Sequence, residues 1–310
     1  MRSRPRAANV LAIARATAAG GERRRHALRA LQFRLLRHMT PVVAVDGDGV
    51  RYFVSTRDNG VGMPLYVYGA FEPGELWTAV CVLERSSGHP FVGGDRLFVD
   101  VGANIGTATI QAIAHHRAYD AIAYEPDAFN VELLQHNLLT NGLTERVKVV
   151  RAAVSDECRA LALELSDDNF GDHRVKLESR TSVSPEPTRR VTTVPGITLD
   201  SQIEAGVFEL DRIGLVSIDT QGHEAQVLAG ATRLCESDVP VMLEYWPYGL
   251  RAAGGSGQLR DILARCYGRY VDLAAAFSGG RVAYRPTDEL AALEDDLPQF
   301  GWANLLLCPR

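Results

Sequence analysis

Residues 97–106 read LFVDVGANIG, a short apolar run followed at once by a glycine-rich turn. The run at residues 97–101 predicts a strand that is buried on both faces, and we expect a helix over residues 105–116. Glycines at such a junction let the backbone pass close to a ligand, and the start of the following helix favours negative charge. The stretch therefore predicts the first strand, ligand loop and helix of a doubly wound α/β fold.

Strand and helix patterns continue to alternate after this junction. Further strands are expected at residues 121–124, 147–154, 213–218, 239–245, 270–275 and 304–308. Helices are expected at residues 129–141, 224–235 and 259–266. Repeated alternation of this kind predicts a mostly parallel sheet with helices on both faces.

Charge divides the 310-residue chain into a basic leader and an acidic body. Residues 1–40 contain ten arginines and one acidic residue, a charge of +9, whereas the whole chain carries −5 and the rest therefore −14. The leader has the pattern of a helix with Leu28, Leu31 and Leu35 on one face. We expect this helix to pack on the body or on a second subunit, which is compatible with a homodimer.

The segment after the leader is expected to form short strands at residues 42–45 and 50–55 and a helix at residues 75–85. The expected organisation is thus a leader (1–40), a strand-rich lead-in (41–92) and a main domain (93–310).

Charge, hydropathy and cysteine content argue against several classes of protein. The mildly acidic net charge argues against a nucleic-acid binder, which needs a basic face. No apolar segment is long enough to cross a bilayer, and Arg15 interrupts the best signal-peptide candidate. Five scattered cysteines without a Cys-x-x-Cys pair favour a reducing compartment over a zinc or disulfide framework. We expect a cytoplasmic protein without membrane or nucleic-acid partners.

The turn after the first strand favours a particular ligand. It contains Gly102-x-x-x-Gly106 in place of the Gly-x-Gly-x-x-Gly of dinucleotide-binding folds. Asp100 at the strand end is unfavourable beside a pyrophosphate but suits an ammonium group. A zwitterionic nucleoside such as S-adenosylmethionine fits both observations, and the alternative is a tight turn without a ligand.

Three more acidic residues follow the ends of predicted strands. Glu125 comes directly after the second strand, where an acid accepts hydrogen bonds from both ribose hydroxyls. Asp219 and Glu244 stand at the ends of the strands at residues 213–218 and 239–245. The carboxyl ends of parallel strands meet at one edge of a sheet, so these acids and Asp100 are expected to gather at one site.

Four motifs, in this order, carry a family resemblance: Asp-Val-Gly-Ala-Asn-Ile-Gly (100–106), Glu-Pro (125–126), Ala-Ala-Val-Ser-Asp (152–156) and Ile-Asp-Thr-Gln-Gly-His-Glu (218–224). Together they resemble the FkbM family of S-adenosylmethionine-dependent methyltransferases, over roughly residues 97–246. Two positions depart from the family pattern: Ser217 stands where a lysine is frequent, and Gln221 where an acid is common.

The resemblance implies a class I, Rossmann-like methyltransferase sheet of seven strands, the last one antiparallel, and S-adenosylmethionine as cofactor. The residues that would hold this cofactor are Asp100, Gly102 and Asn104 at the methionine part, Gly106 in the same loop, Glu125 at the ribose hydroxyls, Ala153 and Asp156 at the adenine, and Asp219 facing the sulfonium and the acceptor. It also implies a small natural product or a glycan as acceptor, methylated at a hydroxyl.

A hydroxyl acceptor loses its proton as the new bond forms, so a nearby base contributes. His223 is the first candidate because imidazole titrates near neutral pH, and Asp219 and Glu244 are the next. The alternative for His223 is a polar residue at the start of a helix. A divalent cation held by these three residues is a further alternative, but we expect no metal.

A polar insertion at residues 155–196 interrupts the alternation and is expected to form a hairpin with a loop near residues 181–188. Within it, Asp172, His173 and Arg174 follow a glycine, which suits a lid over a polar acceptor; an exposed hairpin turn is the alternative. Glu224 and Tyr245, beside the strand-end acids, complete the expected substrate-binding set.

The function expected from these features is O-methylation of a hydroxyl by in-line transfer from S-adenosylmethionine. A nicotinamide-dependent oxidoreductase on a similar sheet is an alternative that the missing Gly-x-Gly-x-x-Gly disfavours. A non-catalytic module that only binds the cofactor is another, which the presence of Asp219, His223 and Glu244 disfavours.

Overall fold

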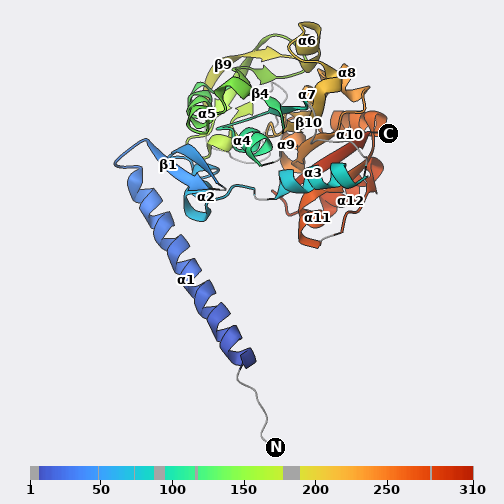
Figure 1. Cartoon of the computed structure of the whole chain (residues 1–310). Helices are drawn as coiled ribbons and strands as arrows, with labels where there is room; N and C mark the ends of the chain where they lie inside the picture. Colours follow the sequence, from blue (N-terminus) through green and yellow to red (C-terminus); the bar gives the residue numbers. More distant parts are fainter. Residues whose placement is uncertain are drawn as a thin grey trace, which may run out of the picture. The chain divides into compact units, whose positions relative to one another are not determined.

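The computed structural model describes residues 7–47, 49–72, 74–86, 95–115, 118–176, 189–279 and 281–309, with side chains from residue 21 onward. The chain forms two compact units, Met1–Phe71 and Glu72–Arg310 (Figure 1). The division falls inside the expected lead-in of residues 41–92.

The first unit contains the leader helix α1 (Ala7–Leu36), the strands β1 (Val42–Gly47) and β2 (Val50–Ser55), and the helix α2 (Gly62–Tyr68). β1 and β2 form an antiparallel hairpin. Phe33 of α1 is fully buried against the ring of Tyr66, and the Arg29 Nε donates a 2.6 Å hydrogen bond to the Tyr66 carbonyl. The leucine face expected on this helix is exposed at Leu28, Leu31 and Leu35.

A central sheet forms the core of the second unit. Its strands are β3 (Leu97–Val101), β4 (Asp120–Tyr124), β5 (Val147–Val150), β10 (Ile213–Ile218), β11 (Val241–Tyr245), β12 (Tyr267–Asp272), β13 (Arg285–Pro286) and β14 (Ala303–Pro309). Their order is β13-β12-β14-β11-β10-β3-β4-β5, with β14 antiparallel to both of its neighbours. The mostly parallel Rossmann-like sheet is confirmed, but with eight strands instead of seven. The extra strand is the two-residue edge strand β13, where the missing N–H of Pro286 does not interrupt the sheet.

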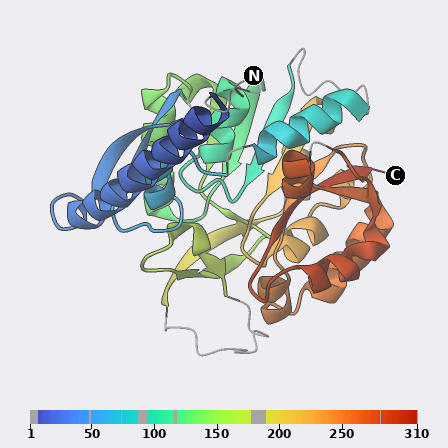
Figure 2. The same ribbon diagram turned by 90° about the horizontal axis from the view of Figure 1, so that it is seen from below.

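Helices lie on both faces of this sheet (Figures 1 and 2). They are α3 (Glu75–Ser86), α4 (Thr107–Ala114), α5 (Ala128–Thr140), α6 (Leu199–Glu204), α7 (Glu224–Ala229), α8 (Thr232–Cys235), α9 (Pro247–Ala252), α10 (Ser256–Cys266), α11 (Leu273–Gly279) and α12 (Leu290–Asp296). Short 3-10 turns occur at Thr144–Arg146, Phe170–Asp172, Leu210–Arg212 and Thr287–Glu289.

The helix expected at residues 224–235 is broken into α7 and α8. A Cβ at Gly230 would lie 2.1 Å from the Ser155 carbonyl oxygen, so the chain at Ser155 passes directly against this glycine. The expected strand at residues 147–154 is likewise divided, because its last two residues leave the central sheet and pair elsewhere.

The insertion forms a small sheet of its own. Its strands are β6 (Ala153–Val154), β7 (Ala160–Leu165), β8 (Arg174–Val175) and β9 (Arg190–Ile197), in the order β6-β9-β7-β8. β7 and β9 form an antiparallel hairpin, and alternate residues Leu161, Leu163 and Leu165 are buried in its own apolar cluster. The loop expected near residues 181–188 lies outside the described residues.

The glycine loop between β3 and α4 lies against the end of β10. Gly102 has a left-handed backbone with φ 89°, and a Cβ there would lie 1.8 Å from the Asp219 carbonyl oxygen. In the same region the Asp219 N–H donates to the Val101 carbonyl at 3.0 Å. Only a residue without a side chain therefore lets these two strand ends meet.

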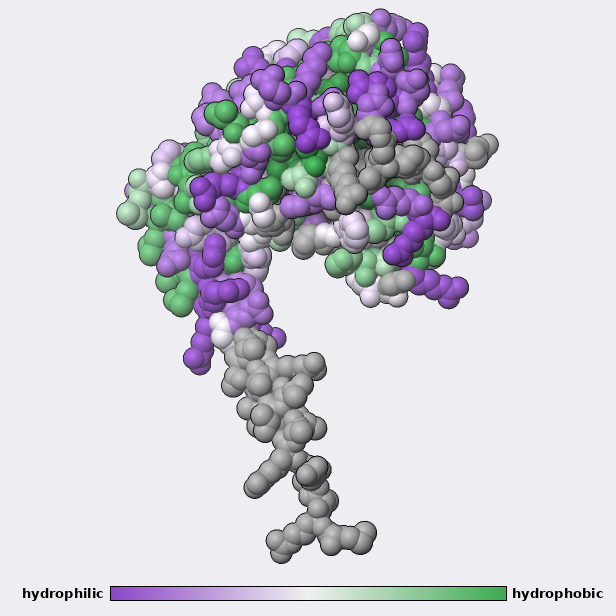
Figure 3. Space-filling view, viewed as in Figure 1, coloured by the Kyte–Doolittle hydropathy of each residue, from purple (hydrophilic) through white to green (hydrophobic). Residues whose placement is uncertain are grey.

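In the described ranges, no helix has the length and apolar character needed to span a membrane. The face seen in Figure 3 is largely hydrophilic, with scattered apolar patches.

Substitution of Gly102 by alanine should destabilise the protein strongly. The Cβ would collide with backbone that cannot move away, and the left-handed conformation adds strain, so we expect a loss of about 3 kcal/mol or more in the free energy of unfolding. Gly142→Ala is the matched control, since Gly142 is also left-handed at φ 68° but has no atom within 4 Å of a Cβ. The Gly142→Ala variant should lose about 1 kcal/mol in the free energy of unfolding. Urea unfolding measures both variants. Equal losses of stability in the two would contradict the close contact between Gly102 and the Asp219 carbonyl.

Candidate active site

Four acidic side chains lie at the carboxyl ends of four adjacent strands. Glu125 follows β4, Asp100 is in β3, Asp219 follows β10 and Glu244 is in β11, and these strands are neighbours and parallel. Asp100, Glu125 and Glu244 are all less than 9% exposed. The gathering of acids expected at this edge of the sheet is therefore present.

No described cation balances these acids. Within the described ranges, no lysine, arginine or histidine forms an ion pair with any of the four. Burying a carboxylate without a counter-charge is costly, so such groups hold a proton or await a cationic ligand. In the same part of the chain, no group of three or more His, Cys, Asp or Glu side chains is arranged to hold a metal ion.

Glu125 organises the cofactor-side loops. Its Oε2 accepts a 2.9 Å hydrogen bond from the Asn104 N–H, and its Oε1 accepts one of 2.8 Å from the Asp127 N–H. Burial raises the pKa of Glu125 to about 7, although these N–H donors oppose the shift. One carboxylate thus fixes both the glycine loop and the start of α5.

Asp100 lies deeper in the same region. The Thr109 hydroxyl, one turn into the helix that follows the loop, donates to its Oδ2 at 2.5 Å. Burial raises the pKa of Asp100 to about 7, and repulsion from Asp219 adds to the shift. Asp100 is therefore poised to ionise when a positive group arrives.

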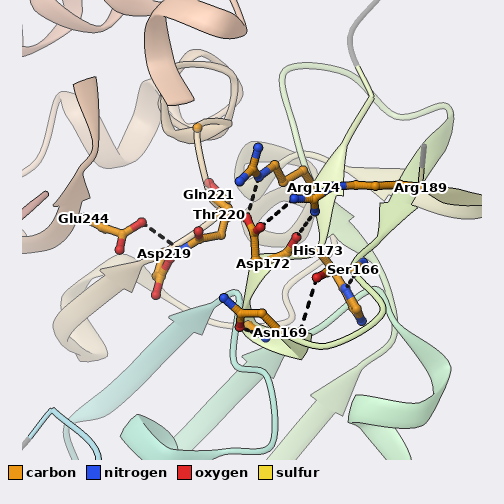
Figure 4. Close-up of polar contacts among 12 residues, drawn as sticks. Ser166, Asn169, Asp172, His173, Arg174, Arg189, Asp219, Thr220, Gln221 and Glu244 are labelled. Atoms are coloured by element: carbon orange, nitrogen blue, oxygen red, sulfur yellow. Dashed lines mark hydrogen bonds and ion pairs between the residues drawn. The ribbon is translucent and has the colours of Figure 1, made fainter. Parts of the chain in front are cut away.

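The amide of Gln221 joins Asp219 to Glu244 (Figure 4). Its Nε2 donates to Asp219 Oδ1 at 2.8 Å and to Glu244 Oε2 at 2.9 Å. The loop that carries Gln221 is organised by the fully buried Glu224, whose Oε1 accepts hydrogen bonds from the N–H groups of Thr220 and Gly222, both at 3.0 Å. Glu224, expected to bind substrate, thus holds the loop in place.

Burial and repulsion from other acids act on both members of the Asp219–Glu244 pair. Burial raises the pKa of Glu244 well above its ordinary value, and Asp219, Glu224 and Glu72 add repulsion. Burial raises the pKa of Asp219 too, but hydrogen bonds from Gln221 and from the Glu244 carboxyl favour its ionised form. The hydrogen bond with Asp219 therefore adds to the rise in the pKa of Glu244, whereas hydrogen bonds oppose the rise at Asp219.

Glu72 and Glu75 extend the acidic region. The Glu72 side chain is reached by solvent, but protein surrounds it densely enough that dehydration raises its pKa to about 8, with repulsion from Asp219 and Glu75 adding to the effect. Asn304 of β14 donates a hydrogen bond to Glu75.

His223 does not share this environment. Its Nε2 lies 2.9 Å from Ser155 Oγ, and that hydroxyl donates its hydrogen to Asp156 Oδ1 at 2.9 Å. The serine therefore accepts from the histidine, whose hydrogen sits on Nε2. Burial lowers the pKa of His223 to about 4, so its ring is neutral and ties the start of α7 to the chain after β6.

The insertion brings a charged cluster to the same rim. Asp172 accepts hydrogen bonds from Arg174 Nε at 2.5 Å and from Arg189 Nη2 at 2.6 Å. The Arg174 guanidinium also stacks on the Trp246 ring, 4.6 Å from its centroid. A small recess is lined by Arg174, Val175, Gln221, Gly222, His223, Gly249 and Ala253. Figure 4 shows the cluster beside the Gln221 loop.

Phe170 fastens the insertion to the glycine loop. Its carbonyl accepts hydrogen bonds from Asn104 Nδ2 at 3.0 Å and from Asn130 Nδ2 at 3.2 Å. His173 supports the same turn, because its Nδ1 accepts the Ser166 N–H at 3.0 Å and its ring packs on that of Phe170. The expected lid residue His173 is thus held within the insertion.

The remaining expected site residues make their contacts elsewhere. Ala153 is buried in β6, and Asp156 is exposed just after it. A Cβ at Gly106 would meet Leu134 at 2.3 Å, so this glycine keeps the loop close to α5. The Tyr245 hydroxyl donates to Glu294 of α12, so the structure does not bring Tyr245 into the group.

Several site residues were not in the expected set: Glu72, Thr109, Arg189, Gln221 and Trp246. Gln221 was noticeable only as a departure from the family pattern. Thr109 lies at the right place in the helix for a partner of Asp100, but nothing in the sequence marks that contact. Glu72 and Arg189 reach the site through tertiary packing alone.

Comparisons with known proteins agree with this chemistry. The family model described as the methyltransferase FkbM domain matches residues 100–268. No curated protein matches this chain.

Three solved structures that align with the chain share 11% sequence identity with it. A putative transferase from Pyrococcus horikoshii has a TM-score of 0.42, with 86% of this chain and 70% of that chain covered. A putative O-methyltransferase from Klebsiella pneumoniae has a TM-score of 0.41, with coverages of 77% and 80%. A tRNA methyltransferase from M. jannaschii has a TM-score of 0.39, with coverages of 86% and 53%.

The buried carboxyls should make the cofactor-free protein less stable as the pH rises. Asp100, Glu125 and Glu224 have folded-state pKa values of about 7, above their unfolded values near 4, so the folded state binds more protons between these limits. Stability contributed by these groups is present at low pH and is lost as the pH rises from about 4 to about 7. His223 acts oppositely between about pH 4 and 6.5, but it is one group against three.

Asp100→Asn should therefore stabilise the cofactor-free protein more at pH 8 than at pH 5, by about 2–3 kcal/mol in the free energy of unfolding. The control is Asp168→Asn, since Asp168 is exposed. Urea unfolding at both pH values measures the difference. A loss of stability at pH 8 in the Asp100 variant would contradict the assignment of this carboxyl as an uncompensated buried acid.

Proposed function

This chain belongs to the FkbM methyltransferase family, and we propose that it transfers the methyl group of S-adenosylmethionine to a hydroxyl of a small natural product or sugar-containing acceptor. One observation carries the proposal: four acids without a described counter-cation lie in a row at the strand ends beside the glycine loop. The cofactor of this family carries a sulfonium and an ammonium group, the positive charges that such acids accommodate.

The residues at the loop fit the parts of the cofactor. Asp100 offers a carboxylate for the ammonium group. The Oε2 of Glu125 accepts one backbone N–H and retains a second lone pair for a ribose hydroxyl, whereas its Oε1 accepts both the Asp127 N–H and the Asn130 amide. Asp219, on the next strand, is the carboxylate for the sulfonium side. Ala153 and Asp156 remain our candidates for the adenine side.

Bound S-adenosylmethionine supplies an electrophilic methyl group, and the chain supplies position and a proton acceptor. Orientation of two reactants contributes much of the rate in such transfers. We assign the proton of the acceptor hydroxyl to an oxygen of Asp219, the ionised member of its pair with Glu244. His223 is a neutral ring bonded to Ser155, which makes it a positioning residue for the loop and a weaker base than the sequence suggests.

The insertion supplies the other wall for the acceptor. Arg174 is anchored on both Asp172 and Trp246 and lines the recess beside Gln221. Guanidinium and carboxylate groups held in this way present several hydrogen-bonding groups to a polar, hydroxylated acceptor. We therefore place the acceptor between the insertion and the Gln221 loop.

Calorimetry should detect binding of S-adenosylmethionine to the intact chain. Asp100→Ala and Glu125→Ala should each weaken it about 10- to 100-fold, because each removes a charged hydrogen-bonding partner. Asp168→Ala, at an exposed acid, should leave the affinity unchanged. A folded wild-type chain that binds no S-adenosylmethionine, or that binds a nicotinamide cofactor instead, would contradict the proposal.

Transfer of a tritiated methyl group to a panel of hydroxylated natural products and glycans should yield a labelled ether. Asp219→Asn should reduce transfer by about 100-fold or more while the acceptor remains bound, since it removes the proton acceptor. Label on a nitrogen would contradict the assigned acceptor atom. Binding of the cofactor with no transfer to any hydroxyl would favour the non-catalytic alternative.

A further inference from the structure

The Gln221 amide spans the ends of two adjacent strands. One nitrogen lies 2.8 Å from an Asp219 oxygen and 2.9 Å from a Glu244 oxygen, and an amide NH₂ has two hydrogens, one for each contact (Figure 4). The reverse orientation would set the amide oxygen against two carboxyl oxygens. The contacts therefore determine which way the amide points.

The backbone holds this amide rigidly. Gln221 has a left-handed conformation with φ 55°, which is strained for a residue other than glycine. Glu224 accepts N–H groups from Thr220 and Gly222, one on each side of Gln221. A Cβ at Gly222 would lie 2.8 Å from the Gly249 carbonyl carbon, so the loop is also fixed against α9. The strain is maintained by contacts on three sides.

Among the described residues, the titratable groups with the largest effects on this pair from the neighbouring elements are acidic. Repulsion on Glu244 comes from Glu72 and Glu224, and Asp172 of the insertion repels Asp219. Asp219 in turn raises the pKa values of Glu72, Glu75, Asp100 and Glu224. Two arginines of the insertion, Arg174 and Arg189, form ion pairs with Asp172. The Gln221 amide donates two hydrogen bonds to the Asp219–Glu244 pair but brings no positive charge. The pair therefore keeps one proton.

The two carboxyls are not equivalent. Glu244 lies within β11 and is 7% exposed, whereas Asp219 follows β10 and is partly exposed. The more enclosed group holds the proton, because desolvation penalises its charged form more. The amide donates one hydrogen to each carboxyl, at 2.8 Å to Asp219 and 2.9 Å to Glu244, so the difference in enclosure decides which of the two is ionised.

We propose that Gln221 is a positioning residue that holds Asp219 and Glu244 together as a pair with a single negative charge, which the less enclosed Asp219 presents to the sulfonium of the cofactor. This inference rests on the proposed function. A charge at that place discriminates S-adenosylmethionine, which has a positive sulfur, from S-adenosylhomocysteine, whose sulfur is neutral. The ratio of the two affinities therefore reports the charge of Asp219 without any acceptor.

The test compares the wild-type chain with Gln221→Met and with Gln135→Met, a control at an exposed glutamine of α5. Calorimetry gives the affinities for both ligands from pH 6 to pH 9. Removal of the amide should raise the pH at which the preference for S-adenosylmethionine is half-maximal by at least about one unit, since a hydrogen bond to a charged group is worth about 1.5–3 kcal/mol. The preference should recover at pH 9.

The possible results separate the two proposals. An upward shift in Gln221→Met, with wild-type behaviour in the control, supports the role of Gln221. Equal loss of both affinities without a shift overturns it, because Gln221 would then only shape the loop. Failure of the wild-type chain to bind either ligand overturns the proposed function, and this inference with it.

A second measurement uses the wild-type protein, in case Gln221→Met does not fold. Infrared difference spectra at pH 7 between the wild-type chain and each variant should show the loss of one protonated carboxyl in Glu244→Gln and of none in Asp219→Asn, while the signals of the other protonated acids remain in both. Disappearance in Asp219→Asn alone would place the proton on the other member and overturn the proposal.

Discussion

The cost of burying carboxyl groups that have no counter-cation among the described residues is the constraint on which this site depends. Asp100, Glu125 and Glu244 are nearly inaccessible to solvent, and Asp219 stands among them. The protein offsets part of that cost with N–H and O–H donors and part by retaining protons at neutral pH. The negative charge that remains is complementary to a ligand with two positive groups. S-adenosylmethionine is such a ligand, and this connects the fold to methyl transfer.

The same constraint explains why the surrounding loops are so firmly held. Glu125 fixes the glycine loop, Glu224 fixes the loop after β10, and the Phe170 carbonyl joins the insertion to Asn104 and Asn130. Each acid is thus both a part of the site and a centre of hydrogen bonding for the backbone around it. Geometry of this kind positions reactants before the reaction, which is where much of the rate of methyl transfer originates.

The sequence allowed prediction of the parts of the site that depend on local pattern. The turn after residue 101 and the acids at strand ends follow from alternation in a parallel sheet, where strand ends necessarily meet. His223 shows where such reasoning stops: four residues after Asp219, it turns to Ser155 because Gln221 and Gly222 adopt left-handed conformations. Those conformations, the Gln221 bridge and the approach of Glu72 depend on tertiary contacts that no local pattern records.

Proton release on cofactor binding tests the central claim most directly. Carboxyls that hold protons near pH 7 must lose them when a cationic ligand pairs with them, so S-adenosylmethionine should release about one proton or more at pH 7. Calorimetry in buffers of different ionisation enthalpy measures this number. Release from the wild-type chain that diminishes in Asp100→Asn is the predicted result. Binding without any proton exchange would contradict the account, because the acids would then be ionised before the cofactor arrives.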